Sequence, residues 1–145
     1  MTFTAAFLRT LALAFWFGGG LATFLATSAV FQRAPDRKVA GDLAGAILAR
    51  TGLARSVAVA LLVIAIALGA RGGAVDLGIA CAALQGLAVV ADLLTRKARR
   101  EAGGTIDALP PGDPLRRRFA ALHGVAMLVL LLQVLAAGIG LALTS

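Results

Sequence analysis

Three ionisable residues within or at the edge of long apolar segments are the positions where this chain could carry chemistry. Arg55 lies near the start of the second apolar segment, Asp92 four residues before Arg96, and His123 five residues after Arg118. At 1.5 Å per residue, Asp92 and His123 would lie about 6–7.5 Å inside one membrane edge, with Arg55 at similar depth. Ionisable groups inside a bilayer are costly and therefore candidates for function.

We predict an intramembrane polar cluster from these three residues, in which Asp92 pairs with Arg55 or with His123. The alternative is that they act separately. Arg55 would then extend its charged end to the lipid headgroups, and His123 would bond to the backbone. A functional role needs the three side chains to meet in one leaflet of the bilayer.

Two amides, Gln85 and Gln133, fall near the middle of the third and fourth apolar segments. On antiparallel helices they would lie at matched depth and hydrogen-bond to each other, which stabilises helix association in membranes. We favour this interhelical role over the binding of a substrate.

The elements that position these side chains are four long apolar segments. The chain is 60% hydrophobic and 14% charged, whereas soluble domains carry about 25% charged residues. We therefore predict an all-α integral membrane protein, a single domain folded as an antiparallel four-transmembrane-helix bundle. The expected helices cover about residues 7–31, 51–70, 74–95 and 115–143.

The positive charge indicates how the chain is threaded. Of the 14 Lys and Arg residues, all except Arg9 and Arg71 lie around the first and third gaps between these segments. The positive-inside rule places both gaps in the cytoplasm, with the N and C termini outside. The Ala- and Arg-rich composition is compatible with a bacterium of high GC content, so we expect the inner membrane and periplasmic termini.

The net charge of +7 follows from the same rule, so we expect no nucleic-acid partner. Basic clusters next to a membrane attract anionic lipid headgroups on the cytoplasmic side. In the first gap, residues 37–48 are amphipathic, because Val39, Leu43 and Ile47 recur every four residues. This pattern predicts a short interfacial helix before the second crossing.

Gly18, Gly19 and Gly20 lie in the middle of the first segment. Small residues let a second helix approach closely, so we predict that they form a packing surface. Trp16 lies too deep for an interfacial position and is predicted to pack, although a stacked cofactor is an alternative. One His and one Cys are too few for a structural zinc site. A single His could still hold a haem, alone or paired across a homodimer, but we expect no bound cofactor or metal.

Three stretches together resemble a known family. They are Phe7-Leu8-Arg9 through Ala14-Phe15-Trp16-Phe17-Gly18-Gly19 to Ala29-Val30-Phe31-Gln32, then Val39-Ala40-Gly41-Asp42-Leu43-Ala44-Gly45, and Arg118-Phe119-Ala120-Ala121-Leu122-His123-Gly124. Over nearly its whole length the chain resembles the transmembrane protein 205-like family, four-helix membrane proteins that form a domain of unknown function. Val30 departs from the proline expected there.

The resemblance implies no reaction, but it marks Trp16, Gly18, Gly41, Gly45, Phe119, His123 and Gly124. We expect a non-enzymatic accessory subunit or a module that handles lipid or small molecules, as a homo-oligomer or in a larger membrane complex. One alternative is a redox- or metal-linked membrane protein that uses His123. The other is a small transporter in which Asp92 and His123 relay protons, which requires a polar cavity reaching past mid-membrane.

Overall fold

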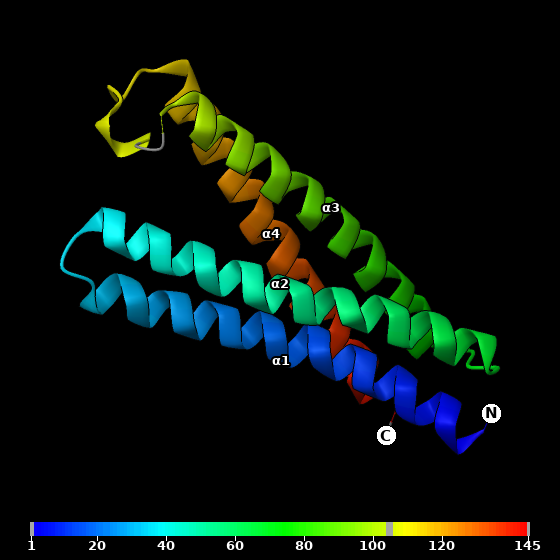
Figure 1. The fold of residues 1–145 in the computed structure, drawn as a ribbon. Coiled ribbons are helices and arrows are strands. Elements are labelled where there is room, and N and C mark those ends of the chain that lie inside the picture. The colour runs from blue at the N-terminus through cyan, green and yellow to red at the C-terminus, as the bar shows by residue number, and fades with distance from the viewer. Residues whose placement is uncertain (1, 104–105, 145) are drawn as a thin grey trace.

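The computed structural model describes residues 2–103 and 106–144, without the side chains of Arg37 and Asp107. Its four α-helices, drawn in Figure 1, are α1 (Phe3–Arg33), α2 (Arg37–Ala67), α3 (Gly73–Glu101) and α4 (Pro114–Ala142), with a 3₁₀ turn η1 (Ile106–Ala108) before α4. Each α-helix is long and apolar enough to cross a membrane. The prediction of an all-α four-helix bundle is confirmed.

Local sequence signals set the helix ends. The Asp36 carboxylate accepts a hydrogen bond from the Val39 amide at 2.8 Å and starts α2. Asp113 does the same for α4 through the Leu115 amide at 2.7 Å, and both are favoured N-cap residues. The turn between α2 and α3 needs positive φ at Gly69 (93°) and Gly72 (97°), which only glycine adopts without strain.

The separate interfacial helix predicted for residues 37–48 is wrong, because α2 runs without interruption from Arg37 to Ala67. Ala49 and Arg50, which lie between the expected interfacial helix and the expected second crossing, do not interrupt a helix. The Thr51 hydroxyl donates to the Ile47 carbonyl at 2.9 Å within the same helix. A helix of 31 residues is about 46 Å long. It therefore exceeds the roughly 30 Å of a bilayer's hydrocarbon core.

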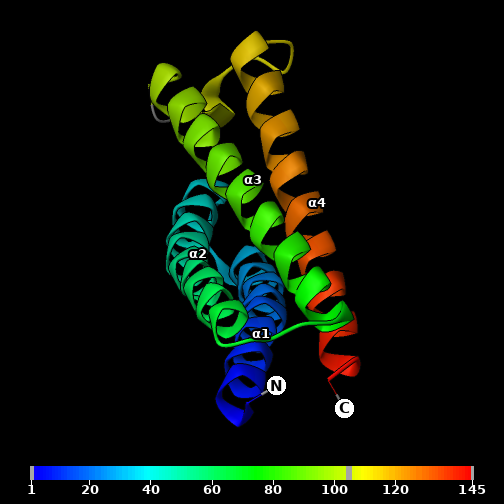
Figure 2. The same cartoon turned by 90° about the vertical axis from the view of Figure 1, so that its right-hand side faces the viewer.

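The helices form two antiparallel hairpins, α1 with α2 and α3 with α4, and each pair packs closely. Figures 1 and 2 show that the hairpins meet at the end that holds both termini and the α2–α3 turn. Toward the other end, where α1 turns into α2 and α3 connects to α4, the hairpins separate. Helices α2 and α3 accordingly contact each other much less than the partners within a hairpin do.

The core lies where the hairpins meet. Trp16 and Leu13 of α1 are fully buried there against Leu62 of α2, Cys81 of α3 and Ala137 of α4. The prediction that Trp16 is a packing residue is confirmed.

The three glycines of α1 differ in their surroundings. A Cβ on Gly20 would overlap the Val134 side chain, and one on Gly19 would lie 3.5 Å from Cγ of Arg55. A Cβ on Gly18 would have nothing within 4 Å. The predicted packing surface therefore holds for Gly19 and Gly20, whereas Gly18 faces away from the other described helices of the chain.

Candidate ligand cavity

A cavity of about 330 Å³ lies between the two hairpins, where they begin to separate. Its walls come from residues in 48–56 of α2, 85–96 of α3 and 123–130 of α4. Arg55, Asp92 and His123 all line it, so the three predicted site residues share one cavity. Their partners, however, differ from those expected.

The floor of the cavity is a hydrogen-bonded network that links three helices. Arg55 donates from Nη1 to Oε1 of Gln133 at 3.1 Å. Gln133 donates from Nε2 to the Cys81 carbonyl at 2.8 Å and to Oε1 of Gln85 at 3.3 Å. Gln85 in turn donates to the Ser56 hydroxyl at 3.2 Å. The predicted bond between Gln85 and Gln133 is confirmed.

Arg55 lies deeper than the sequence indicated. It is 12 residues before the end of α2 at Ala67, or about 18 Å along the helix, and its side chain reaches Gln133 in the body of α4. Only 5% of Arg55 is exposed, so it does not extend to the headgroups. Its Nε atom is buried without a hydrogen-bond partner. Among the residues that the structure describes, no carboxylate forms an ion pair with it.

Asp92 pairs with Arg96, through a 2.8 Å contact between Oδ2 and Nε on the same helix. The predicted pairing with Arg55 or His123 is therefore wrong. Asp92 lies seven residues beyond Gln85, which is about 10 Å nearer the cavity mouth than the network, and a partner four residues away on a helix face is always within reach. Both side chains of this pair are about half exposed, at 50% and 56%.

His123 is exposed at the mouth and stacks on Phe119, with ring centroids 6.2 Å apart and planes at 1°. A Cβ on the neighbouring Gly124 would have nothing within 4 Å. Within the described part of the chain, no group of three His, Cys, Asp or Glu side chains is arranged to hold a metal ion.

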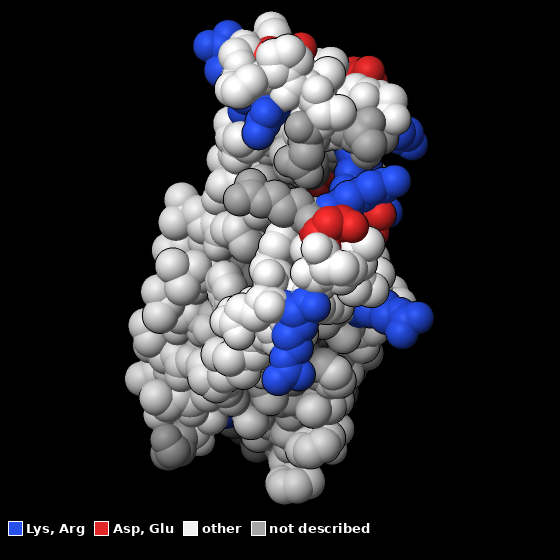
Figure 3. All heavy atoms as spheres, turned by 90° about the vertical axis from the view of Figure 1, so that its left-hand side faces the viewer, with Lys and Arg blue, Asp and Glu red and all other residues white. Residues whose placement is uncertain are grey.

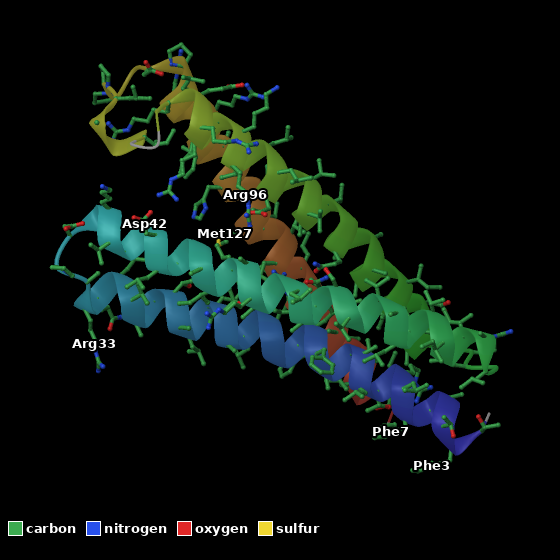
Figure 4. All side chains as sticks on the ribbon, viewed as in Figure 1. Phe3, Phe7, Arg33, Asp42, Arg96 and Met127 are labelled. Carbon is green, nitrogen blue, oxygen red and sulfur yellow. The ribbon has the colours of Figure 1, made fainter. Side chains whose placement is uncertain are left out.

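An ion pair joins the two hairpins beyond the mouth. Asp42 of α2 contacts Arg99 of α3 at 3.3 Å, and a Cβ on Gly41 would lie 3.4 Å from Nη2 of Arg99. Gly45, one turn further along, would have open space at its Cβ. Figure 4 shows Asp42 on the side of α2 that faces α3, with Arg96 and Met127 pointing into the space between the hairpins.

Sequence reasoning missed this pair because residues 37–48 were expected to form a separate interfacial helix, which offered no reason to pair Asp42 with a residue of α3. The run of arginines at the end of α3 was the available signal. Figure 3, which looks onto this end of the molecule, shows basic and acidic side chains gathered there. At the connection between α3 and α4, Arg118 and Glu101 pair at 3.7 Å.

The side of the cavity between α2 and α3 is bordered by apolar side chains. Leu53, Val89 and Leu93 line the cavity and are 70%, 45% and 59% exposed. All three belong to helices able to span a membrane, so their exposed faces suit hydrocarbon. The arrangement combines a polar floor with an apolar border, which fits a ligand that has one polar end.

Comparison with known proteins gives no match, since no protein-family profile, curated protein or solved structure matches the chain. The resemblance to the transmembrane protein 205-like family stays a prediction from its motifs. Of the positions it marks, Trp16 lies in the core, Gly41 lies beside Arg99, and Phe119 and His123 stack at the cavity mouth.

Proposed function

We propose that this protein is a non-enzymatic integral membrane protein that binds a lipid or small molecule in the cavity between its two hairpins. The supporting observation is the cavity itself, with a buried polar floor and apolar side chains along its border. Its volume of about 330 Å³ falls within the range of ligand sites, roughly 300–1,000 Å³. The protein would act alone, as a homo-oligomer or as an accessory subunit of a larger membrane complex.

We propose the bacterial inner membrane as its location, with both termini in the periplasm. The support is the concentration of Lys and Arg around the first and third connections, which the positive-inside rule assigns to the cytoplasm. On that side, Arg96, Arg99 and Arg100 border a shallow surface pocket. Such a group favours anionic lipid headgroups.

A proton relay through Asp92 and His123 has less support. Arg96 already binds the Asp92 carboxylate, and the Arg55–Gln133–Gln85 network of the cavity floor contains no carboxylate or imidazole. Ligand binding would involve both the polar floor and the mouth of the cavity, whereas a proton relay through Asp92 and His123 would involve only the mouth.

The test is native mass spectrometry of the protein extracted gently from its own membrane. Ala88 of α3 lines the cavity, and Ala83, one turn and a half earlier on the same helix, is exposed on the outside. We expect wild type and Ala83→Phe to retain the same small molecule or lipid, and Ala88→Phe to lose it. Retention of the same molecules by all three proteins would contradict the proposed function.

A further inference from the structure

The cavity floor holds a positive charge, that of Arg55, which no carboxylate of the described residues neutralises. A guanidinium group has five N–H donors, and the hydrogen bond from Nη1 of Arg55 ends on a neutral amide oxygen, Oε1 of Gln133. Its Nε atom is buried and lacks a partner. Burying a cation without a counter-charge is unfavourable, so a bound anion at this position would stabilise the structure.

The network holds Nη1 of Arg55 on Gln133, next to the cavity that Arg55 lines, and leaves the charge of Arg55 intact. The amide nitrogen of Gln133 is held by the Cys81 carbonyl and by Gln85, which directs its oxygen to Arg55. Gln85 is held in turn by Ser56. Every group in this chain of contacts is neutral except Arg55. The nearest acid along the cavity wall, Asp92, is already paired with Arg96 near the mouth.

The border of the cavity indicates from which side the anion arrives. Leu53 on α2 and Val89 and Leu93 on α3 line the cavity with apolar side chains that are largely exposed. A ligand that passes between these helices comes from the hydrocarbon of the bilayer, and it must therefore carry an apolar chain. At the end of the molecule beyond the mouth, α2 and α3 are joined by the ion pair of Asp42 and Arg99.

We propose that the ligand is a membrane amphiphile with one anionic group, a carboxylate or a phosphate, and that Arg55 binds this group. The acyl chain would extend between α2 and α3 along Leu53, Val89 and Leu93. This inference rests on the proposed ligand cavity and specifies the chemistry of its occupant. The guanidinium geometry suits both headgroups, because it pairs with carboxylate and phosphate through two parallel hydrogen bonds.

The first experiment uses the full-length wild-type protein in phosphatidylcholine nanodiscs at pH 8 and measures binding of radiolabelled oleate. Unlabelled oleate and lysophosphatidic acid are expected to displace it. Methyl oleate, which lacks the charge, is expected to compete about 10- to 100-fold less well, the range for loss of a charge-assisted hydrogen bond. Sodium acetate and inorganic phosphate, which lack the chain, are expected not to compete at the concentrations at which oleate does.

The second experiment compares two arginines of α2. Arg55→Gln keeps an amide that can bond to Gln133 but removes the charge, and it is expected to weaken oleate binding about 10-fold or more. Arg50→Gln removes an exposed charge five residues earlier on the same helix, and it should change binding less than about twofold, since exposed charges are screened. If Arg55→Gln fails to fold, as judged by circular dichroism, the wild-type competition series alone decides.

Four results would overturn the inference. Oleate binding by folded Arg55→Gln as tight as by wild type would show that Arg55 does not hold the anionic group. Equal competition by methyl oleate would show that binding does not depend on the negative charge of the oleate carboxylate. Equal competition by acetate or phosphate would show that the anion comes from water. No binding of oleate or lysophosphatidic acid would exclude an anionic amphiphile altogether. In each case the cavity would still be a binding site if Ala88→Phe removed a molecule that wild type and Ala83→Phe retain, so failure of this inference can be told apart from failure of the proposed function.

Discussion

The two ends of the interface between the hairpins are built on different principles. At the terminal end, small residues let the helices touch, as where a Cβ on Gly140 would lie 3.0 Å from Leu13 and one on Gly78 2.9 Å from Leu62. At the other end, the hairpins are joined by an ion pair, in which the long Arg99 side chain of α3 reaches the Asp42 carboxylate of α2 at 3.3 Å. The cavity begins at the boundary between these ends, at the Arg55–Gln133–Gln85 network.

This difference shows how four helices can leave a cavity between them without losing their fold. The close-packed end supplies the stability, because dispersion contacts between helices need the backbone to approach closely. At the charged end, the ion pair that joins the hairpins, between Asp42 and Arg99, is exposed, and exposed ion pairs contribute little to stability. Changes at the two ends should therefore have unequal effects on stability.

The largest loss of stability is expected from a substitution at the boundary between the two ends, in the Arg55–Gln133–Gln85 network. Gln133→Leu removes the acceptor of Arg55 and the bonds to Cys81 and Gln85. We expect a loss of about 3 kcal/mol in the free energy of unfolding, because a buried cation is left without an acceptor. The measurement is unfolding in mixed detergent micelles followed by circular dichroism.

Gln32→Leu is the matched control, because Gln32 is exposed near the end of α1. It should change the unfolding free energy by less than about 0.5 kcal/mol. The double variant Arg55→Leu with Gln133→Leu should be more stable than Gln133→Leu alone, since neither polar partner is then left unpaired. Equal losses of unfolding free energy for the Gln133 and Gln32 variants would show that the network does not stabilise the fold.

Substitutions of two glycines of α1 are expected to change the stability of the protein by smaller amounts and in opposite directions. Gly20→Ala should destabilise the protein by about 2 kcal/mol, because the added methyl group overlaps Val134. Val134 is β-branched and cannot easily rotate away on a helix. Gly18→Ala has open space and should be neutral or stabilising by up to about 1 kcal/mol. Thermal unfolding of the two variants in the same detergent measures the difference, and destabilisation of similar size in both would contradict it.

The smallest effect on stability, less than about 0.5 kcal/mol, is expected from Asp42→Asn, which removes the ion pair with Arg99. The shape of the charged end should nevertheless change. Spin labels at Leu43 and Arg100, read by pulsed electron resonance, should report a longer or broader distance between α2 and α3. Asp36→Asn is the control, since Asn caps a helix as well as Asp does. Identical distance distributions in both variants would show that the ion pair does not hold this end closed.

Periodic and local features of the chain were predictable. The apolar segments gave the four helices, and the matched depth of Gln85 and Gln133 gave their hydrogen bond, because both depend only on position along a helix. The continuity of α2 was not found, since an amphipathic start followed by an apolar run resembles two helices as closely as one. Nothing in residues 48–51 breaks the helix.

The composition of the site could be predicted better than its contacts. Arg55, Asp92 and His123 do line one cavity, but the depth of a residue says nothing about its direction around the helix. Arg55 therefore donates a hydrogen bond to Gln133 and does not pair with Asp92, which forms an ion pair with Arg96 on its own helix. The separation of the hairpins, which creates the cavity, depends on packing between segments distant in sequence, such as Gly20 against Val134.

The most direct test of the proposed ligand site is a solid-state NMR distance between bound oleate and Arg55. The protein, labelled with ¹⁵N-arginine in phosphatidylcholine bilayers, would receive oleate labelled with ¹³C at the carboxyl carbon, and Arg55→Lys would assign the signal. We expect the carboxyl carbon to lie about 4 Å from the guanidinium nitrogens of Arg55, as hydrogen bonding requires. Oleate that binds to the protein without any such contact, or with the same contacts after Arg55→Lys, would contradict it.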